Sequence, residues 1–185
     1  MSISKASLYK SLESIYPHIH TSVEEQGYGL AILSKIPIKN RQNFLFKETI
    51  MNRGIIFGKI NDMIIATTHL ESEFSKDNPC KINQFNSMIE LLSEYPKVII
   101  VGDTNLTKND DSKIIIKDFK DVYLKYDNSK DKLYTYNGPE NPIIKNKIKS
   151  RIDRIYIKGD IKFISFNLEK EIIISDHYAI FSELE

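Results

Sequence analysis

Short apolar runs separated by glycine, proline and polar residues dominate the first half of the chain. The runs Tyr28–Ser34, Gly54–Ile60 and Met63–His69 are too short for helices and rich in β-branched residues, so each predicts a strand. Asn61-Asp62 lies between the second and third runs and is a turn-forming pair. The pattern therefore predicts an antiparallel hairpin formed by these two runs.

The spacing of apolar residues changes to three and four in the segment before Pro96. The positions concerned are Ile82, Phe85, Met88, Ile89 and Leu92, which share one face of a helix. We expect this helix to cover a sheet. A shorter pattern of the same kind predicts a helix over Ser7–Ile15, ended by Pro17.

Strands also dominate the second half of the chain. Lys97–Gly102 is a β-branched run that leads directly into the polar sequence Asp103-Thr-Asn. The further predicted strands are Leu133–Tyr136, Arg151–Lys158, residues 162–167 and Tyr178–Leu184. Many strands with few helices indicate one α+β domain over residues 1–185, in which two sheets pack face to face and helices lie outside them.

The charge composition restricts the kinds of ligand that the whole molecule attracts. Of the 185 residues, 26 are Lys or Arg and 25 are Asp or Glu, so the formal net charge is only +1. Non-specific binding to duplex DNA usually depends on an overall basic field, which this balance excludes. Any phosphate-binding surface must therefore be local.

Cysteine content and hydropathy indicate where the protein works. Cys80 is the single cysteine, so the chain cannot form an internal disulfide, and a reducing compartment fits best. No stretch approaches the roughly 20 apolar residues that cross a bilayer, and the first ten residues contain no continuous apolar run. We expect an intracellular protein, cytoplasmic or nuclear, that is neither secreted nor membrane-bound.

Polar side chains collect at the ends of four predicted strands. The segments are Thr68–Ser72, Gly102–Leu106, Arg151–Arg154 and Ser175–His177. Any one of them alone has a structural explanation, because an aspartate after a strand commonly forms a turn or caps a helix. Four such segments in one chain favour a shared site.

Taken in this order, the four segments resemble the endonuclease/exonuclease/phosphatase family. The sequences Thr-His-Leu-Glu-Ser, Gly-Asp-Thr-Asn-Leu and Arg-Ile-Asp-Arg-Ile are most similar to its 5′-tyrosyl-DNA phosphodiesterase branch, as is Tyr134-Thr-Tyr136. The resemblance runs from about Glu25 to Leu184. It implies a two-sheet β-sandwich of the DNase I-like kind, flanked by helices, whose strand-end loops form one active-site rim.

The resemblance also implies catalytic roles. Asp103 would orient or deprotonate the attacking water, and Asn105 would hydrogen-bond the scissile phosphate. His177 would stabilise charge on the phosphoryl oxygen. Asp153 would orient this imidazole and favour its protonated form through its negative charge.

Other positions would bind the substrate and a metal ion. Asp176 resembles a residue close to the metal, His69 and Ser72 resemble side chains that border the phosphate pocket, and Arg53 and Tyr136 complete the substrate-binding set. The cofactor implied is Mg²⁺, or Mn²⁺, because the charge that develops on a phosphodiester needs a cation and preorganised donors. Mg²⁺ takes only one or two protein carboxylates, together with phosphate and water.

The same residues also have purely structural interpretations. Asp103 and Asn105 could form a turn that bonds its own backbone, and Asp153 could pair with Arg151 or Arg154 at the surface. Asp176-His177 could be a surface pair, and His69 and Ser72 could satisfy backbone groups at a strand end. Alternating aromatic residues such as Tyr134 and Tyr136 commonly pack in a core.

The beginning of the family's pattern has no counterpart in this sequence. That pattern opens with a strand ending in Asn and a strand ending in Gln-Glu, whose glutamate is the principal metal ligand; Met1 falls near its place. We therefore expect a domain that is partial at its N-terminus, lacks the first two strands and has an open sheet edge. The chain could be a fragment, could pair with another polypeptide or a second copy, or could bind without cleaving.

The function that the resemblance implies is Mg²⁺-dependent phosphodiester hydrolysis at nucleic-acid ends, in DNA repair. The substrate would be a 5′-phosphotyrosyl linkage between a protein and DNA or RNA. Abasic-site DNA, other nucleic-acid phosphodiesters and phosphoinositides remain alternatives within the enzyme class. The alternative from another class is a catalytically impaired homologue or fragment that binds phosphodiester or nucleic-acid ligands without turnover.

Overall fold

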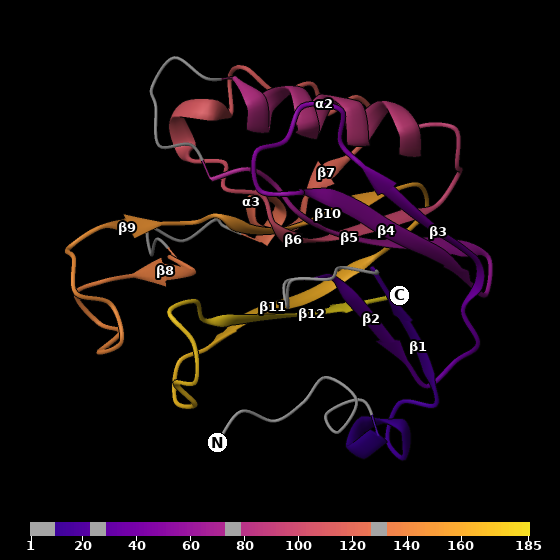
Figure 1. The fold of residues 1–185 in the computed structure, drawn as a ribbon, viewed down its shortest axis with the longest axis horizontal. Coiled ribbons are helices and arrows are strands. Elements are labelled where there is room, and N and C mark those ends of the chain that lie inside the picture. Colours follow the sequence, from indigo (N-terminus) through magenta and orange to yellow (C-terminus); the bar gives the residue numbers. More distant parts are fainter. Residues whose placement is uncertain (1–9, 23–28, 73–78, 127–132) are drawn as a thin grey trace.

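The computed structural model describes residues 10–22, 29–72, 79–126 and 133–185. Its largest element is a six-stranded mixed sheet with the order β3-β4-β5-β6-β10-β7 (Figure 1). In that order the strands are Lys39–Leu45, Gly54–Ile60, Met63–His69, Val98–Asp103, Asp153–Lys158 and Lys120–Asp121. Besides the helical residues 10–13, the helices of the described ranges are α2 (Cys80–Leu92), the 3-10 turn η1 (Lys108–Asp110) and α3 (Val122–Tyr126).

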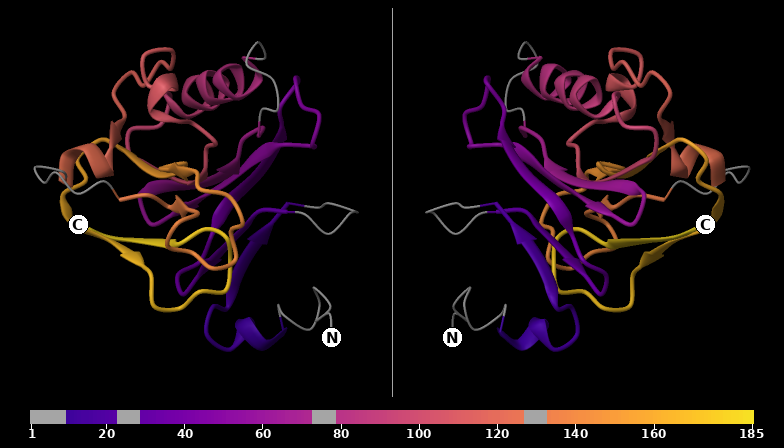
Figure 2. Two further views of the ribbon diagram at one scale, coloured as in Figure 1. Left: turned by 90° about the vertical axis from the view of Figure 1, so that its left-hand side faces the viewer. Right: turned by 90° about the vertical axis from the view of Figure 1, so that its right-hand side faces the viewer.

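Three two-stranded sheets accompany the six-stranded one. They are β1–β2 (His18–Thr21 and Ala31–Ser34), β8–β9 (Tyr136–Asn137 and Lys149–Ser150) and β11–β12 (Phe163–Glu169 and Ala179–Leu184). The β1–β2 and β11–β12 pairs lie on one face of the large sheet and α2 lies on the other, as Figures 1 and 2 show. The expected class, an α+β sandwich with a helix outside the sheets, is confirmed.

The hairpin predicted from the apolar runs forms with the predicted bounds. β4 and β5 pair antiparallel from Gly54 opposite His69 to Ile60 opposite Met63. Asn61 has a φ of 54° in the connecting turn. Asparagine tolerates this left-handed conformation better than most residues, because its short side chain bonds locally, so the turn fixes the register of the hairpin.

The predicted helix packs its apolar face on the large sheet. Phe85, Met88, Ile89 and Leu92 of α2 are fully buried in a cluster that also contains Tyr156 of β10. The rings of Phe85 and Tyr156 lie 5.2 Å apart between centroids. The 3.6-residue period of a helix placed these side chains on one stripe, so their burial follows from the sequence pattern.

The opposite face of the same strands is also apolar. Ile155 and Ile157 of β10 point away from Tyr156 and form a second cluster with Phe166 of β11. Successive side chains of a strand alternate between faces, so one short run supplies both cores. Burial on both faces holds β10 rigidly between the two layers.

Several predicted boundaries differ from the structure. The predicted strand at residues 133–136 begins only at Tyr136, where β8 pairs with β9. Residues 10–13 of the predicted N-terminal helix are helical, whereas residues 7–9 of that helix and Tyr28 of the first predicted strand lie outside the described residues. β1 and β3 were not predicted, because their sequences are polar and every residue of β3 is exposed.

Within the described ranges, the helices are all too short or too polar to cross a bilayer.

We expect Phe85→Ala to lower the free energy of unfolding by about 3–5 kcal/mol, because it empties a fully buried ring site between helix and sheet. Urea denaturation measures this change. Ile174→Ala is the control, since Ile174 is 86% exposed and its truncation should change stability by less than about 0.5 kcal/mol. Equal losses in the two variants would contradict the packing described above.

Candidate active site

Strand register places three of the predicted site residues in one row across the large sheet. β5 runs parallel to β6 with His69 opposite Asp103. β10 runs antiparallel to β6 with Asp153 opposite Asp103. All three residues stand at the ends of their strands, so their side chains meet at one edge of the sheet. We call this set of three residues the carboxylate row.

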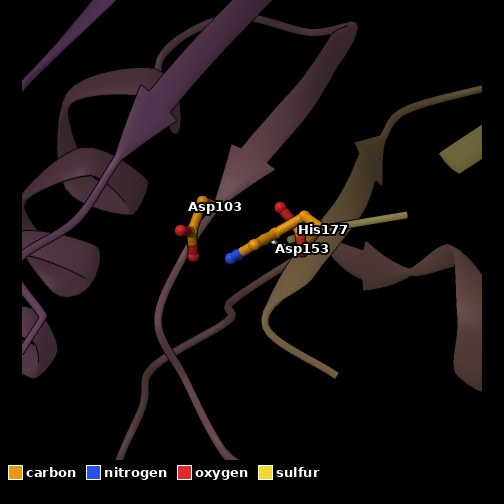
Figure 3. Close-up of side chains that lie close together, drawn as sticks. All are labelled: Asp103, Asp153 and His177. Atoms are coloured by element: carbon orange, nitrogen blue, oxygen red, sulfur yellow. Dashed lines mark hydrogen bonds and ion pairs between the residues drawn. The ribbon is translucent and has the colours of Figure 1, made fainter. Parts of the chain in front are cut away.

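His177 joins the row from the loop that precedes β12. The Tyr178 N–H donates to the Thr135 carbonyl at 2.8 Å, and His177 forms a bridge with Tyr136, so β8 fixes this loop. His177 Nδ1 lies 2.8 Å from Asp153 Oδ2. Figure 3 shows the imidazole beside Asp153 with its other nitrogen toward Asp103. One ligand atom from each of Asp103, Asp153 and His177 lies within 4.8 Å of the others.

Asp103 takes part in a local turn and in the row at the same time. Its Oδ1 accepts the Asn105 N–H at 2.9 Å, while its Oδ2 lies 3.2 Å from His69 Nε2. Asn105 has a φ of 51°, and its Nδ2 donates to the Leu70 carbonyl at 2.9 Å. The turn interpretation of this pair is therefore correct, and the turn is also what directs the second carboxylate oxygen into the site.

The environment shifts the pKa values of three of these groups. Burial, and then the charge of Asp153, raises the pKa of Asp103 to about 6. Burial alone would lower the pKa of His177, but its hydrogen bond to Asp153 and the charge of that carboxylate outweigh burial, so the pKa is raised. Burial, followed by the charge of Arg53, lowers the pKa of His69 to about 4. At neutral pH His69 is thus uncharged, and its contact with Asp103 is not an ion pair.

The predicted substrate residues are placed at different distances from the row. Tyr136 contacts His177 directly, since the two rings meet edge-on with 5.5 Å between their centroids. Ser72 Oγ and Arg53 Nη2 both approach the sulfur of Met51, at 3.4 and 3.6 Å. The charge of Arg53 also lowers the pKa of both Asp103 and His69. We infer that Arg53 lies beside the row.

The proposed metal residue Asp176 is not part of this cluster. Its side chain is exposed and its carboxylate accepts a hydrogen bond from Ser175 Oγ at 3.2 Å. The group of candidate metal ligands in the described part of the chain contains Asp103, Asp153 and His177 without it. Its charge nevertheless contributes to the raised pKa of His177.

The alternative interpretation of Asp153 as a partner of Arg151 or Arg154 is wrong. Arg151 Nη1 pairs with Asp121 Oδ2 at 2.8 Å, and Arg154 Nη1 pairs with Asp111 Oδ1 at 2.7 Å. Because both arginines are held by other carboxylates, Asp153 remains available to His177. These two aspartates lie 30 and 43 residues away from their arginines.

Glu71 supports the site and was not predicted. It is buried, and its Oε2 accepts hydrogen bonds from Thr49 Oγ1 at 3.0 Å and from the Ile50 N–H at 2.9 Å. Burial would raise its pKa, but these bonds and the charge of Arg53 outweigh burial and lower it. The Arg53 N–H donates to the same Thr49 hydroxyl, so Glu71 holds the loop that carries Arg53.

Thr135 is the second supporting residue that was not predicted. Its side chain is fully buried, and its Oγ1 accepts the N–H groups of Ile152 and Asp153, both at 3.1 Å. Its carbonyl also accepts the Tyr178 N–H. One threonine thus ties both partners of the Asp153–His177 pair to the same segment. The sequence signal was its central place in Tyr134-Thr-Tyr136.

The row fits a hard divalent cation. Mg²⁺ and Mn²⁺ prefer carboxylate oxygens completed by water and phosphate. Asp103 and Asp153 offer two such groups close together, and the repulsion between them contributes to the raised pKa of Asp103. A cation beside these carboxylates would relieve that repulsion. The pKa of His177 is raised, so its ring is protonated more readily than a free imidazole, and a charged ring suits a phosphate oxygen better than a cation.

Comparison with protein families identifies the class. The model of the endonuclease/exonuclease/phosphatase family matches residues 3–177. The chain belongs to this family of phosphate-ester hydrolases. No curated protein sequence matches it.

Solved structures show where the similarity lies within the family. Truncated TDP2 from Caenorhabditis elegans is 25% identical with a TM-score of 0.77, over 96% of this chain and 79% of that one. Zebrafish (D. rerio) TDP2 complexed with single-strand DNA product is 19% identical with a TM-score of 0.85, over 99% and 83%. The 3′ phosphatase NExo from Neisseria, bound to a product DNA hairpin, is 14% identical with a TM-score of 0.74, over 95% and 82%.

We expect Thr135→Val to lower the free energy of unfolding by about 1–3 kcal/mol for each buried N–H that loses its acceptor. Valine has the same shape as threonine, so the change removes only the hydroxyl. Thr135→Ser is the matched control, because it keeps the hydroxyl and loses one methyl, worth about 1 kcal/mol. A valine variant as stable as the serine variant in urea would show that this hydroxyl does not hold the site.

Proposed function

We propose that this protein is a phosphodiesterase that uses Mg²⁺ or Mn²⁺ to cleave phosphodiesters at nucleic-acid ends, and that it cleaves 5′-phosphotyrosyl links between protein and DNA or RNA. The observation that carries the proposal is the carboxylate row closed by His177. The zebrafish TDP2 structure holds a single-strand DNA product and the Neisseria phosphatase holds a product DNA hairpin, which supports a nucleic-acid substrate.

Asp103 is the proposed base that orients and deprotonates the attacking water. A general base works best when its pKa lies near the operating pH, and burial brings the pKa of Asp103 to about 6. Its carboxylate is therefore mostly ionised at pH 7 but more basic than an exposed aspartate. Neutral His69, 3.2 Å away, can donate to this carboxylate and keep it oriented.

His177 and Asn105 are the proposed donors to the phosphoryl oxygens. Asp153 raises the pKa of His177, so the imidazole carries the charge that the developing phosphoryl charge requires. The Asn105 amide has two N–H donors; one is bound to the Leu70 carbonyl, which leaves the other for the phosphate. Arg53, Ser72 and Tyr136 would bind the remainder of the substrate.

A divalent ion at the row would supply further charge stabilisation at the phosphate. Asp153 is the carboxylate beside Asp103 that would hold this ion, which leaves Asp103 to act on the water. Asp176, which lies in the loop before His177, is proposed to act on the site through its charge.

We expect Asp103→Asn and His177→Ala each to reduce Mg²⁺-dependent cleavage of a 5′-tyrosyl oligonucleotide by about 10² to 10⁴-fold, because each removes a positioned acid or base. The rate of tyrosine release measures this loss. Asp160→Asn is the matched control for the first variant, since Asp160 is exposed in the turn between β10 and β11 and should retain full activity.

Equal trace activity in wild type and Asp103→Asn would contradict the proposal. The alternative of binding without turnover predicts a different result for the wild-type protein. It requires a phosphodiester with Mg²⁺ to raise the melting temperature of the wild type while no tyrosine is released. The two outcomes exclude each other in a single preparation.

A further inference from the structure

A cavity opens against the segments that flank the candidate active site. It has a volume of about 460 Å³ and lies between the η1 turn, α3 and the β9 strand. Its lining includes Lys108, Leu124, Tyr134, Ile148 and Lys149. None of these residues belongs to the carboxylate row, and Tyr134 is the first residue of the Tyr134-Thr-Tyr136 motif.

The walls of this cavity continue from the segments that build the site. Thr107 lines it two residues after Asn105, and Arg151 lines it two residues before Asp153. Arg154 donates through Nη2 to the Leu106 carbonyl at 2.8 Å. This bond ties the loop that follows Asn105 to the strand that carries Asp153. The row and the cavity are therefore built on the same two segments, those around Asn105 and Asp153.

The positive charge available to a ligand in this cavity comes from its lysines. Arg151 and Arg154 also line it, but both are paired with aspartates; Arg154 is almost fully buried and Arg151 is partly buried. Lys108 forms no ion pair with any described residue. Lys149 is 3.9 Å from Glu140, at the limit of an ion pair, and its ammonium lies 5.8 Å from the centroid of the Tyr134 ring. Two accessible ammonium groups thus face a cavity that suits an anion.

The same cavity also offers accessible apolar surface. Leu124 is 63% exposed and Ile148 is 60% exposed, although both are large aliphatic residues. Tyr134 is half-buried and also lines the cavity. An aromatic ring with flanking aliphatic side chains and lysines matches a nucleotide, which presents an apolar base face beside a phosphate.

We propose that this cavity binds a nucleotide of a single-stranded nucleic acid, adjacent to the phosphate held at the carboxylate row. Tyr134 stacks on its base, Leu124 and Ile148 border the base, and Lys108 and Lys149 bind the backbone phosphates. This inference rests on the proposed function, because it names where the nucleic-acid part of the substrate lies.

The test measures binding separately from cleavage. A fluorescein-labelled single-stranded oligonucleotide is titrated with the Asp103→Asn protein, in which we expect cleavage to be slow, and fluorescence anisotropy gives Kd. We expect Tyr134→Ala in this background to raise Kd by about 5- to 150-fold, the range for loss of one base stack. Tyr134→Phe should retain affinity because it keeps the ring. Lys149→Ala should raise Kd and reduce the slope of log affinity against log salt by about 0.7.

Lys170→Ala is the matched control for the lysine. Like Lys149 it pairs with Glu140, at 3.2 Å, and lies over a tyrosine ring, that of Tyr178, at 5.9 Å. It does not line the cavity, so its removal should leave Kd unchanged.

An unchanged Kd in Tyr134→Ala, an equal effect of Lys149→Ala and Lys170→Ala, or no binding at all would each overturn the inference. Failure of the proposed function is read from a different assay. The wild-type protein needs only the carboxylate row and His177 to cleave a 5′-tyrosyl mononucleotide. If it does not cleave this compound but still binds the oligonucleotide, the proposed function is overturned and the cavity assignment is retained.

Discussion

The register of three paired strands is the constraint on which the candidate site depends. Parallel pairing sets His69 opposite Asp103, and antiparallel pairing sets Asp153 opposite the same residue. A slip of one residue in β10 would turn Asp153 to the other face of the sheet. The two apolar clusters exclude that slip, because β10 inserts Tyr156 into one cluster and Ile155 into the other. Packing over the whole sheet thus fixes the positions of a few polar atoms at its edge.

The row is destabilising by itself and is stabilised by its surroundings. Like charges opposite each other in a sheet repel, and burial strengthens that repulsion. The Asn105 N–H, the charge of His177 and the charge of Arg53 all lower the pKa of Asp103, but they do not cancel burial and Asp153. The loop after β6 is bound to the residue before β10, since both the N–H and the hydroxyl of Thr104 donate to the Ile152 carbonyl at 2.8 Å. The surrounding structure therefore keeps Asp103 more basic than an exposed aspartate.

Local patterns predicted the fold well where the chain is apolar. The β4–β5 hairpin follows from two short apolar runs, and the buried face of α2 follows from the helical spacing of its apolar residues. Each of these patterns lies within one short segment of the sequence. β3 could not be found this way, because its residues Lys39–Leu45 are exposed and only the pairing with β4 makes them a strand. The same limit applies to the site. Asp103, Asp153 and His177 were found through motifs, whereas the role of Thr135 depends on contacts with residues 17 and 18 positions away.

Coupling between Asp153 and His177 can be measured directly by NMR titration of the His177 imidazole in the wild-type protein and in Asp153→Asn. We expect a pKa above the ordinary value of 6.5 in the wild type, because the carboxylate favours the charged ring over the effect of burial. In the variant burial acts with less opposition, so the pKa should fall clearly. The pKa of His69 is about 4 in the wild type, so its titration is separate from that of His177. A His177 pKa that is the same in both proteins would show that the two residues do not act as one centre.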